Sequence, residues 1–423
     1  MAASVRRTMK AGQCMEPQLH PSPYLPQLDG MRGLAALSVV LAHFNPSPLK
    51  VQPESGIGLL ITASREVALG NLAVVLFFVL SGFLLTYLAR REFHATGHFS
   101  IRHFFVRRVL RIWPLYFTVV AVAYFLQSRY DHLTPEFAAT AETWRWITNH
   151  FSLFALFAGN WSLAFNHVGS FVDHSPGLLR ILWSIGVEEQ FYAVYPFLIF
   201  LVLRHPQIRL GIALLILLIA WGFRIWFCTL NVTQPAMQSA GGMYYATLSY
   251  GDVLLAGVIA GWLAAKPDSL HPRSLLFHAW LGPVLLILAL GVGLLWAEHL
   301  WYPYSGVSVA GYGLVGILFA LFLLWAKACA DHPLTRLLAS RPLRWLGTLS
   351  YGIYMWHVLS NTCLAAALNA WGRNTYLFSS PWLRLVCSVA AAVAFASFSH
   401  WAIERPFLNI KARYRPHPLS TQL

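Results

Sequence analysis

The chain has 423 residues, of which 57% are hydrophobic and only 11% are charged. Soluble domains carry about 25% charged residues, so this composition excludes an ordinary soluble protein and is typical of one that crosses a membrane several times. The net charge of +14 would also suit a nucleic-acid-binding protein, but basic cytoplasmic loops beside anionic lipid explain it more simply. We therefore expect membrane lipid, and no nucleic acid, as a partner.

Ten apolar stretches approach the roughly 20 residues that a membrane-spanning helix needs. In chain order they lie at 30–47, 67–89, 103–126, 183–203, 209–228, 245–265, 279–297, 307–328, 350–370 and 382–403. The sequence therefore predicts an all-α, polytopic membrane protein with about ten transmembrane helices. We expect tails at 1–27 and 408–423 to flank a single membrane domain, 28–407.

Loop charge predicts the orientation of these helices. With both termini in the cytoplasm, nearly all basic loop residues fall on the cytoplasmic side, as the positive-inside rule requires. An eleventh stretch, 146–161, is interrupted by polar residues. If it also crossed the membrane, the basic clusters around Arg341 and Arg413 would face outward. We therefore expect that segment to be re-entrant or interfacial, and the protein to lie in a bacterial inner membrane.

The first apolar stretch carries Arg32 and His43, eleven residues apart. On a helix they are separated by roughly 16 Å along the axis. Ionisable side chains inside a membrane are costly and are usually kept for function. An imidazole that titrates near neutrality can take a proton from an alcohol. His43 is therefore a candidate base; the alternative is a histidine that caps a short helix at the interface.

A basic cluster leads into the third stretch. Arg108 and Arg111 are three residues apart and share a helical face. Two guanidinium groups so placed can hold phosphate by charge-assisted hydrogen bonds. A patch that only sets topology is an equally good interpretation. In the second stretch, Ser81 and Gly82 are better explained by close helix packing than by nucleophilic chemistry, because no elbow pattern surrounds the serine.

The segment 183–196 contains adjacent acidic residues, Glu188 and Glu189. Adjacent helical residues point about 100° apart, so the two cannot act as a facing pair. Glu188 and His43 both lie in the expected outer half, which permits a histidine–carboxylate pair. The alternative is a glutamate stabilised by the helix dipole. Tyr354 and His357 share a face of a later helix and could line the same cavity as His43, although His357 could instead serve the donor side. For the neighbouring Tyr351 and Trp356, an aromatic interfacial belt is at least as good an interpretation.

Taken in order, these segments resemble the acyltransferase 3 family of membrane O-acyltransferases. The matching segments are Arg32 with His43, FFVLSGF at Phe77, RVLR at Arg108, WSIGVEEQFY at Trp183, LSYGIYMWH at Leu349 and IERPF at Ile403. The resemblance maps the family's arginine and histidine onto Arg32 and His43, its paired arginines onto Arg108 and Arg111, and its glutamate onto Glu188. It implies transfer of an acyl group, often acetyl, from a coenzyme A thioester to a hydroxyl on a sugar-bearing acceptor.

The resulting hypothesis has acyl-CoA as a co-substrate, with no permanently bound cofactor and no metal site. His43 and Glu188 are the expected catalytic residues, and the expected acyl-CoA-binding residues are Arg32, Arg107, Arg108 and Arg111. The expected substrate pocket comprises Asp29, Trp183, Ser184, Tyr192, Tyr354 and His357.

The acceptor stays open between a cell-surface polysaccharide and a small macrolide-type metabolite. A saccharide or anion transporter is the alternative from another class, but we find none of the internal repeats that transporters commonly show. Some relatives carry an extracytoplasmic hydrolase-like domain, and we expect none here.

Overall fold

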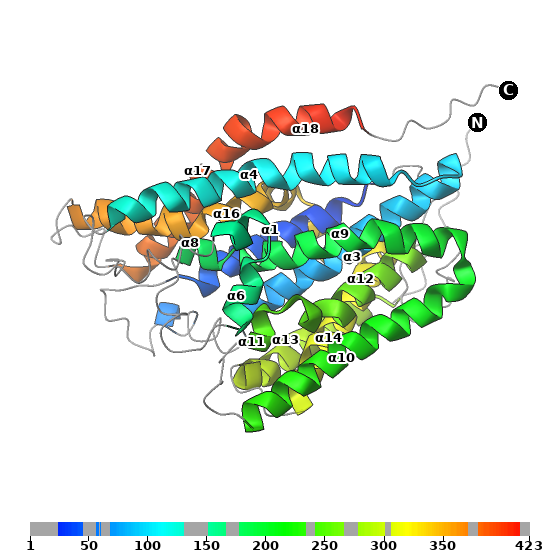
Figure 1. Ribbon diagram of the computed structural model, residues 1–423. Coiled ribbons are helices and arrows are strands. Elements are labelled where there is room, and N and C mark those ends of the chain that lie inside the picture. Colours follow the sequence, from blue (N-terminus) through cyan, green and yellow to red (C-terminus); the bar gives the residue numbers. More distant parts are fainter. Residues whose placement is uncertain are drawn as a thin grey trace.

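The computed structural model describes residues 24–44, 56–58, 60, 68–130, 151–165, 177–233, 242–265, 278–300, 306–370 and 380–414. Helices make up almost all of these residues (Figure 1), which confirms the all-α prediction for the described part. Most of the expected N-terminal tail, residues 1–23, lies outside the described residues, as do 146–150 and 415–423.

The described residues form fifteen α-helices. They are α1 Pro26–Ala42, α3 Leu69–Thr96, α4 Ile101–Tyr130, α6 Gly159–Phe165, α8 Gly177–Arg180, α9 Trp183–Arg204, α10 Arg209–Thr233, α11 Gly242–Tyr245, α12 Gly251–Ala264, α13 Leu281–Leu300, α14 Gly306–Ala328, α15 Pro333–Leu338, α16 Arg341–Ala370, α17 Pro381–Ser399 and α18 Arg405–Ala412. Two 3₁₀ turns, Pro206–Ile208 and Thr247–Tyr250, precede α10 and α12, and a π-helical turn, His400–Glu404, joins α17 to α18.

Each of the ten apolar stretches coincides with a helix, and seven helical segments among the described residues are long and apolar enough to cross a membrane. These seven are Leu69–Thr96, Ile101–Phe125, Leu178–Arg204, Pro206–Leu230, Thr247–Ala264, Val309–Ala328 and Pro381–Lys411. The structure thus supports a multi-pass membrane protein. The count of ten and the cytoplasmic termini stay predictions.

The described part of the segment 146–161 does not form a continuous helix. A short helical piece at 151–155 ends in a turn where Phe157 has φ +56°, and α6 begins at Gly159. Neither piece approaches the roughly 20 residues needed to span. That this segment does not cross the membrane stays a prediction, because residues 146–150 lie outside the described residues.

Helix α10 lies at the outside of the bundle (Figure 1) and presents a strongly apolar surface. Leu210 and Leu218 are about 70% exposed, and further leucine, isoleucine and tryptophan side chains follow along its length. Within the apolar segment Pro206–Leu230, only 17% of the most apolar part is buried inside the protein. Such a face is typical of a helix that contacts lipid tails.

Helix α1 lies inside the bundle, packed along α16 and against α3. Its contact with α16 is close because a glycine faces the backbone: a Cβ on Gly347 would lie 2.0 Å from the carbonyl oxygen of Asp29. Small residues let membrane helices approach in this way. The two helices run in the same direction, from Asp29 beside Gly347 at one end to His43 beside His357 at the other.

The last described helix, α18, lies along α4 (Figure 1) and packs against it. The sequence predicts that a C-terminal tail begins at residue 408, a position that falls within this helix. Helix α18 continues to Ala412, and Leu408 and Lys411 line a cavity. Pro406 falls in the first turn of α18, where its missing N–H costs no helical hydrogen bond. The proline therefore starts this helix and does not end the packed domain.

Candidate functional site

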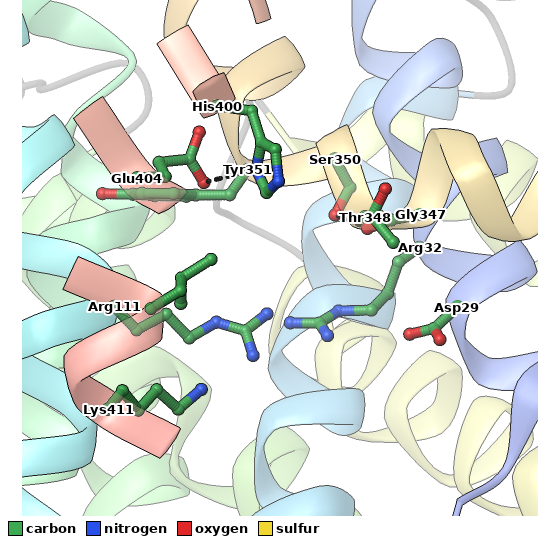
Figure 2. Close-up of a pocket in the computed structure, with 11 residues that line it drawn as sticks. Asp29, Arg32, Arg111, Gly347, Thr348, Ser350, Tyr351, His400, Glu404 and Lys411 are labelled. Carbon is green, nitrogen blue, oxygen red and sulfur yellow. Dashed lines mark hydrogen bonds and ion pairs between the residues drawn. The ribbon is translucent and has the colours of Figure 1, made fainter. Parts of the chain in front are cut away.

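A cavity of about 390 Å³ opens where α1 and α16 meet α4, the π-helical turn and α18. Its volume lies within the roughly 300–1,000 Å³ of typical small-molecule sites. Most of the lining residues have polar or charged side chains (Figure 2); the lining comprises Asp29, Arg32, Arg111, Gly347, Thr348, Ser350, Tyr351, His400, Glu404, Leu408 and Lys411. The first and last described helices therefore contribute to one site.

Three cations dominate this cavity. Figure 2 shows the guanidinium groups of Arg32 and Arg111 extending toward one another from α1 and α4, with the Lys411 ammonium beside them. Within the described residues, none of the three forms an ion pair within 4.0 Å or a side-chain hydrogen bond, and the Nε of Arg32 is buried without a partner. Like charges gathered in a cleft attract anions.

Two carboxylates lie at opposite edges of the cavity. Asp29 accepts a hydrogen bond of 2.8 Å from the hydroxyl of Tyr24, which in turn accepts one of 3.1 Å from Arg344 Nε. Partial burial and then the hydrogen bond to Asp29 raise the pKa of Tyr24. At the other edge, Glu404 Oε2 lies 3.7 Å from His400 Nδ1, while Glu404 Oε1 is buried and accepts no hydrogen bond from the described residues.

The two other arginines of the basic cluster lie outside the cavity lining. Arg107 forms an ion pair of 3.2 Å with Glu92 and donates to the Tyr414 carbonyl. The Arg108 guanidinium lies 5.5 Å from the centre of the Tyr192 ring. Of the four expected acyl-CoA-binding arginines, the structure brings Arg32 and Arg111 together in the cavity and directs the other two elsewhere.

Glu188 lies in the interior, beside α3. Ser81 Oγ donates a hydrogen bond of 2.5 Å to Glu188 Oε1, and Tyr192 Oη lies 3.0 Å from the same serine oxygen. Because the only serine proton goes to Glu188, Tyr192 is the donor in the second bond. Glu188 also interacts electrostatically with Arg32 and Arg108. Ser81 thus supports a carboxylate in addition to packing.

The expected pairing of Glu188 with His43 is not present. Glu188 lies near Arg32, whereas His43 ends α1 about 16 Å further along the axis. The partner of His43 is another histidine, His357, with 5.0 Å between ring centres. The sequence indicates which half of the membrane a residue occupies, but the rotation of α9 around its own axis decides what its carboxylate touches.

Both histidines have one ring nitrogen engaged by a backbone carbonyl. Nδ1 of His43 lies 2.9 Å from the Val39 oxygen, and Nδ1 of His357 lies 2.6 Å from the Tyr354 oxygen. A carbonyl only accepts, so each Nδ1 carries the proton and each Nε2 retains a lone pair. His43 is exposed and His357 is buried. Of the two histidines, His43 is therefore the one with contact to solvent at this end of α1.

The remaining expected pocket residues are packed around this end. Tyr354 donates to the Ile181 carbonyl at 2.8 Å and accepts from Ser184 Oγ at 2.7 Å. Trp183 is buried among Phe78, Tyr244, Tyr245 and Tyr250. These side chains fix α9 and α16 beside α1, and they do not line the cavity described above.

Sequence reasoning missed Lys411 and did not assign a role to Glu404. The signal was present, because Glu404, Leu408 and Lys411 follow one another at spacings of four and three residues and so share a helical face. A short polar helix after the last apolar stretch resembles a solvated tail, so a contribution of this helix to a site was not predicted.

The family model described as an acyltransferase domain matches residues 25–401. The chain is 27% identical over 396 residues to the peptidoglycan O-acetyltransferase OatA of Listeria monocytogenes, covering 90% of this chain and 56% of that protein. It is 29% identical over 349 residues to YrhL of Bacillus subtilis, named as a candidate peptidoglycan O-acetyltransferase, covering 79% of this chain and 48% of that protein. The chain spans about half the length of these curated relatives. No solved structure is significantly similar to it.

Proposed function

Because the chain belongs to the acyltransferase 3 family, we propose that it is an enzyme that transfers an acyl group, most simply acetyl, from cytoplasmic acyl-CoA to a hydroxyl of a carbohydrate. The observation that carries this proposal is the cavity at the start of α1, whose three cations form no ion pair among the described residues, joined by that helix to the exposed His43 at its end. The relatives named as peptidoglycan O-acetyltransferases support a cell-wall polysaccharide as acceptor.

On the donor side, Arg32 and Arg111 bind the phosphate groups of acyl-CoA. Guanidinium groups hold phosphate by two parallel hydrogen bonds, and among the described residues neither group forms an ion pair that would have to break first. The pantetheine arm then extends along α1. The roughly 16 Å from Arg32 to His43 is the distance over which the thioester must be delivered.

At the other end of α1, His43 acts as the general base. Its Nε2 takes the proton of the acceptor hydroxyl as the hydroxyl oxygen forms a bond to the acyl carbon. The carbon–sulfur bond of the thioester breaks, and the thiolate of coenzyme A leaves and takes up the proton from His43. The bond from Nδ1 to the Val39 carbonyl holds the ring in the required tautomer.

Glu188 acts between the donor end of α1, at Arg32, and the acceptor end, at His43. Its carboxylate, held by Ser81, interacts electrostatically with Arg32. We assign the Glu188 carboxylate to positioning Arg32 and not to orienting the imidazole of His43. The exposed side of His43 admits the acceptor from the outer face of a bacterial inner membrane.

The test uses the full chain in lipid nanodiscs with acetyl-CoA and crude cell-wall glycans, and it measures the release of free thiol. We expect release that depends on the glycan and disappears in His43→Ala. The matched control is His98→Ala, because His98 is an exposed histidine far along the chain from α1.

Two results would contradict the proposal. Release that survives in His43→Ala would exclude this histidine as the base. No release with any short-chain acyl-CoA, together with saccharide flux into proteoliposomes, would favour a transporter instead.

A further inference from the structure

The cavity extends beyond the region that the family model matches. That match ends at residue 401, whereas Glu404, Leu408 and Lys411 all line the cavity from the π-helical turn and α18. A π-helical turn inserts an extra residue and is frequent at functional sites. Here it brings one face of α18 into the wall of the cavity.

Lys411 is held among cations. Its ammonium interacts electrostatically with Arg32, Arg107, Arg108 and Arg111, and it has no ion-pair partner within the described residues. Repulsion between these groups opposes folding, and an anion bound between them would reduce that cost. Arg413, which follows the last residue of α18, is exposed, so a basic side chain at this end of the helix can also lie in solvent.

Glu404 adds a requirement that a simple anion does not meet. Its side chain is 8% exposed, and its Oε1 accepts no hydrogen bond from the described residues. A buried carboxylate oxygen without a donor is costly. A bare phosphate offers negative charge to Lys411 but repels Glu404. A nucleotide offers phosphate oxygens to the cations and N–H or O–H donors to the carboxylate.

We propose that the face of α18 and the preceding turn form a nucleotide subsite, in which Lys411 binds a phosphate group and Glu404 accepts a hydrogen bond from the base or the ribose. The proposal rests on the proposed function in one respect, because the nucleotide is then the adenosine phosphate end of acyl-CoA. Lys411 and Glu404 are binding residues for the donor and take no part in proton transfer.

The test is calorimetric titration of the full chain, in nanodiscs of neutral lipid, with adenosine 3′,5′-bisphosphate. We expect Lys411→Gln to weaken binding by about 10- to 100-fold, the range for a lost charge-assisted hydrogen bond. Lys411→Arg should restore most of the affinity, and Arg413→Gln, which removes the same charge from the exposed residue that follows the helix, should leave it unchanged. Equal affinity for native protein and Lys411→Gln would overturn the subsite.

Inorganic pyrophosphate separates a nucleotide site from a general anion site. Glu404→Gln should weaken the nucleotide while leaving pyrophosphate unchanged or tighter, because a repulsive charge is removed. If Glu404→Gln tightens both ligands, the role of Glu404 is wrong. Adding anionic phosphatidylglycerol should not displace the nucleotide; displacement that depends on Lys411 would assign the site to a lipid headgroup and overturn the proposal.

Failure of this subsite differs from failure of the proposed function. A protein that binds adenosine bisphosphate through Lys411 but releases no thiol from acetyl-CoA retains the subsite and loses the acyl transfer. A protein that releases thiol with unchanged donor affinity in Lys411→Gln retains the acyl transfer and loses the subsite.

Discussion

Two buried groups of charged residues in this protein differ in how their cations are compensated. Between α10 and α12, Arg224 is fully buried and donates to both carboxylate oxygens of Asp252, at 3.1 and 2.5 Å. Trp221 and the backbone N–H of Val253 complete the contacts of that carboxylate. In the cavity, Arg32, Arg111 and Lys411 have no such partner within the described residues.

The difference separates structure from binding. A buried charge that is paired and hydrogen-bonded is satisfied within the fold, so its removal harms folding. A cation that the fold leaves unpaired in a cavity retains its hydrogen-bonding capacity for a ligand, so its removal harms binding. Four variants test this separation.

The largest expected effect on stability is that of Asp252→Ala. Removing one partner of a buried ion pair leaves Arg224 uncompensated and should cost about 3–5 kcal/mol, measured as a lower midpoint of thermal unfolding in detergent. The control is Asp331→Ala, because the Asp331–Arg336 pair is exposed and such pairs contribute less than about 1 kcal/mol. Equal losses in the two variants would remove the distinction between buried and exposed pairs.

Arg111→Gln should act in the opposite way. We expect the KM for acyl-CoA to rise about 10- to 100-fold through loss of a charge-assisted hydrogen bond, while the unfolding midpoint stays the same or rises because a repulsive charge is gone. Arg102→Gln, an exposed arginine of the same helix, should change neither quantity. A large loss of stability in Arg111→Gln would make this arginine structural.

Ser81→Ala extends the comparison to a third group of charged residues, the one around Glu188. The variant removes the hydrogen bond to Glu188 and should cost about 1–3 kcal/mol of stability, again measured by thermal unfolding. Ser38, whose hydroxyl bonds only to the carbonyl of Leu34, gives the matched control, Ser38→Ala, with little expected change. A neutral Ser81→Ala would show that Glu188 is satisfied by Tyr192 and the arginines alone.

The smallest effect concerns salt. Raising the ionic strength from about 0.1 M to about 1 M shortens the screening length from about 10 Å to about 3 Å. Acyl-CoA binding to the open cavity should weaken severalfold, while the unfolding midpoint, which depends on the buried Arg224–Asp252 pair, should change little. Equal losses of acyl-CoA affinity and of the unfolding midpoint would indicate that water reaches the cavity and the Arg224–Asp252 pair equally.

Much of the site was predictable because charged residues are conspicuous in an apolar membrane sequence. Arg32, Arg111 and Asp29 stand out against apolar or aromatic neighbours, and all three line the cavity. The sequence indicates depth along a helix and no rotation about it, so it permitted a pairing of Glu188 with His43, whereas the structure has Glu188 beside Ser81 and Arg32. Lys411 was missed because a short polar helix carries no hydropathy signal.

The sequence by itself determined the helical class, the family and the identity of most charged residues in the membrane domain, because hydropathy and ordered motifs are local properties of the chain. Only the tertiary structure decided which charges meet. The close approach of α1 to α16 at Gly347 and the π-helical turn before α18 bring residues 29 and 411 to one cavity. Their separation along the chain has no local signature, so the contact depends on how the helices pack.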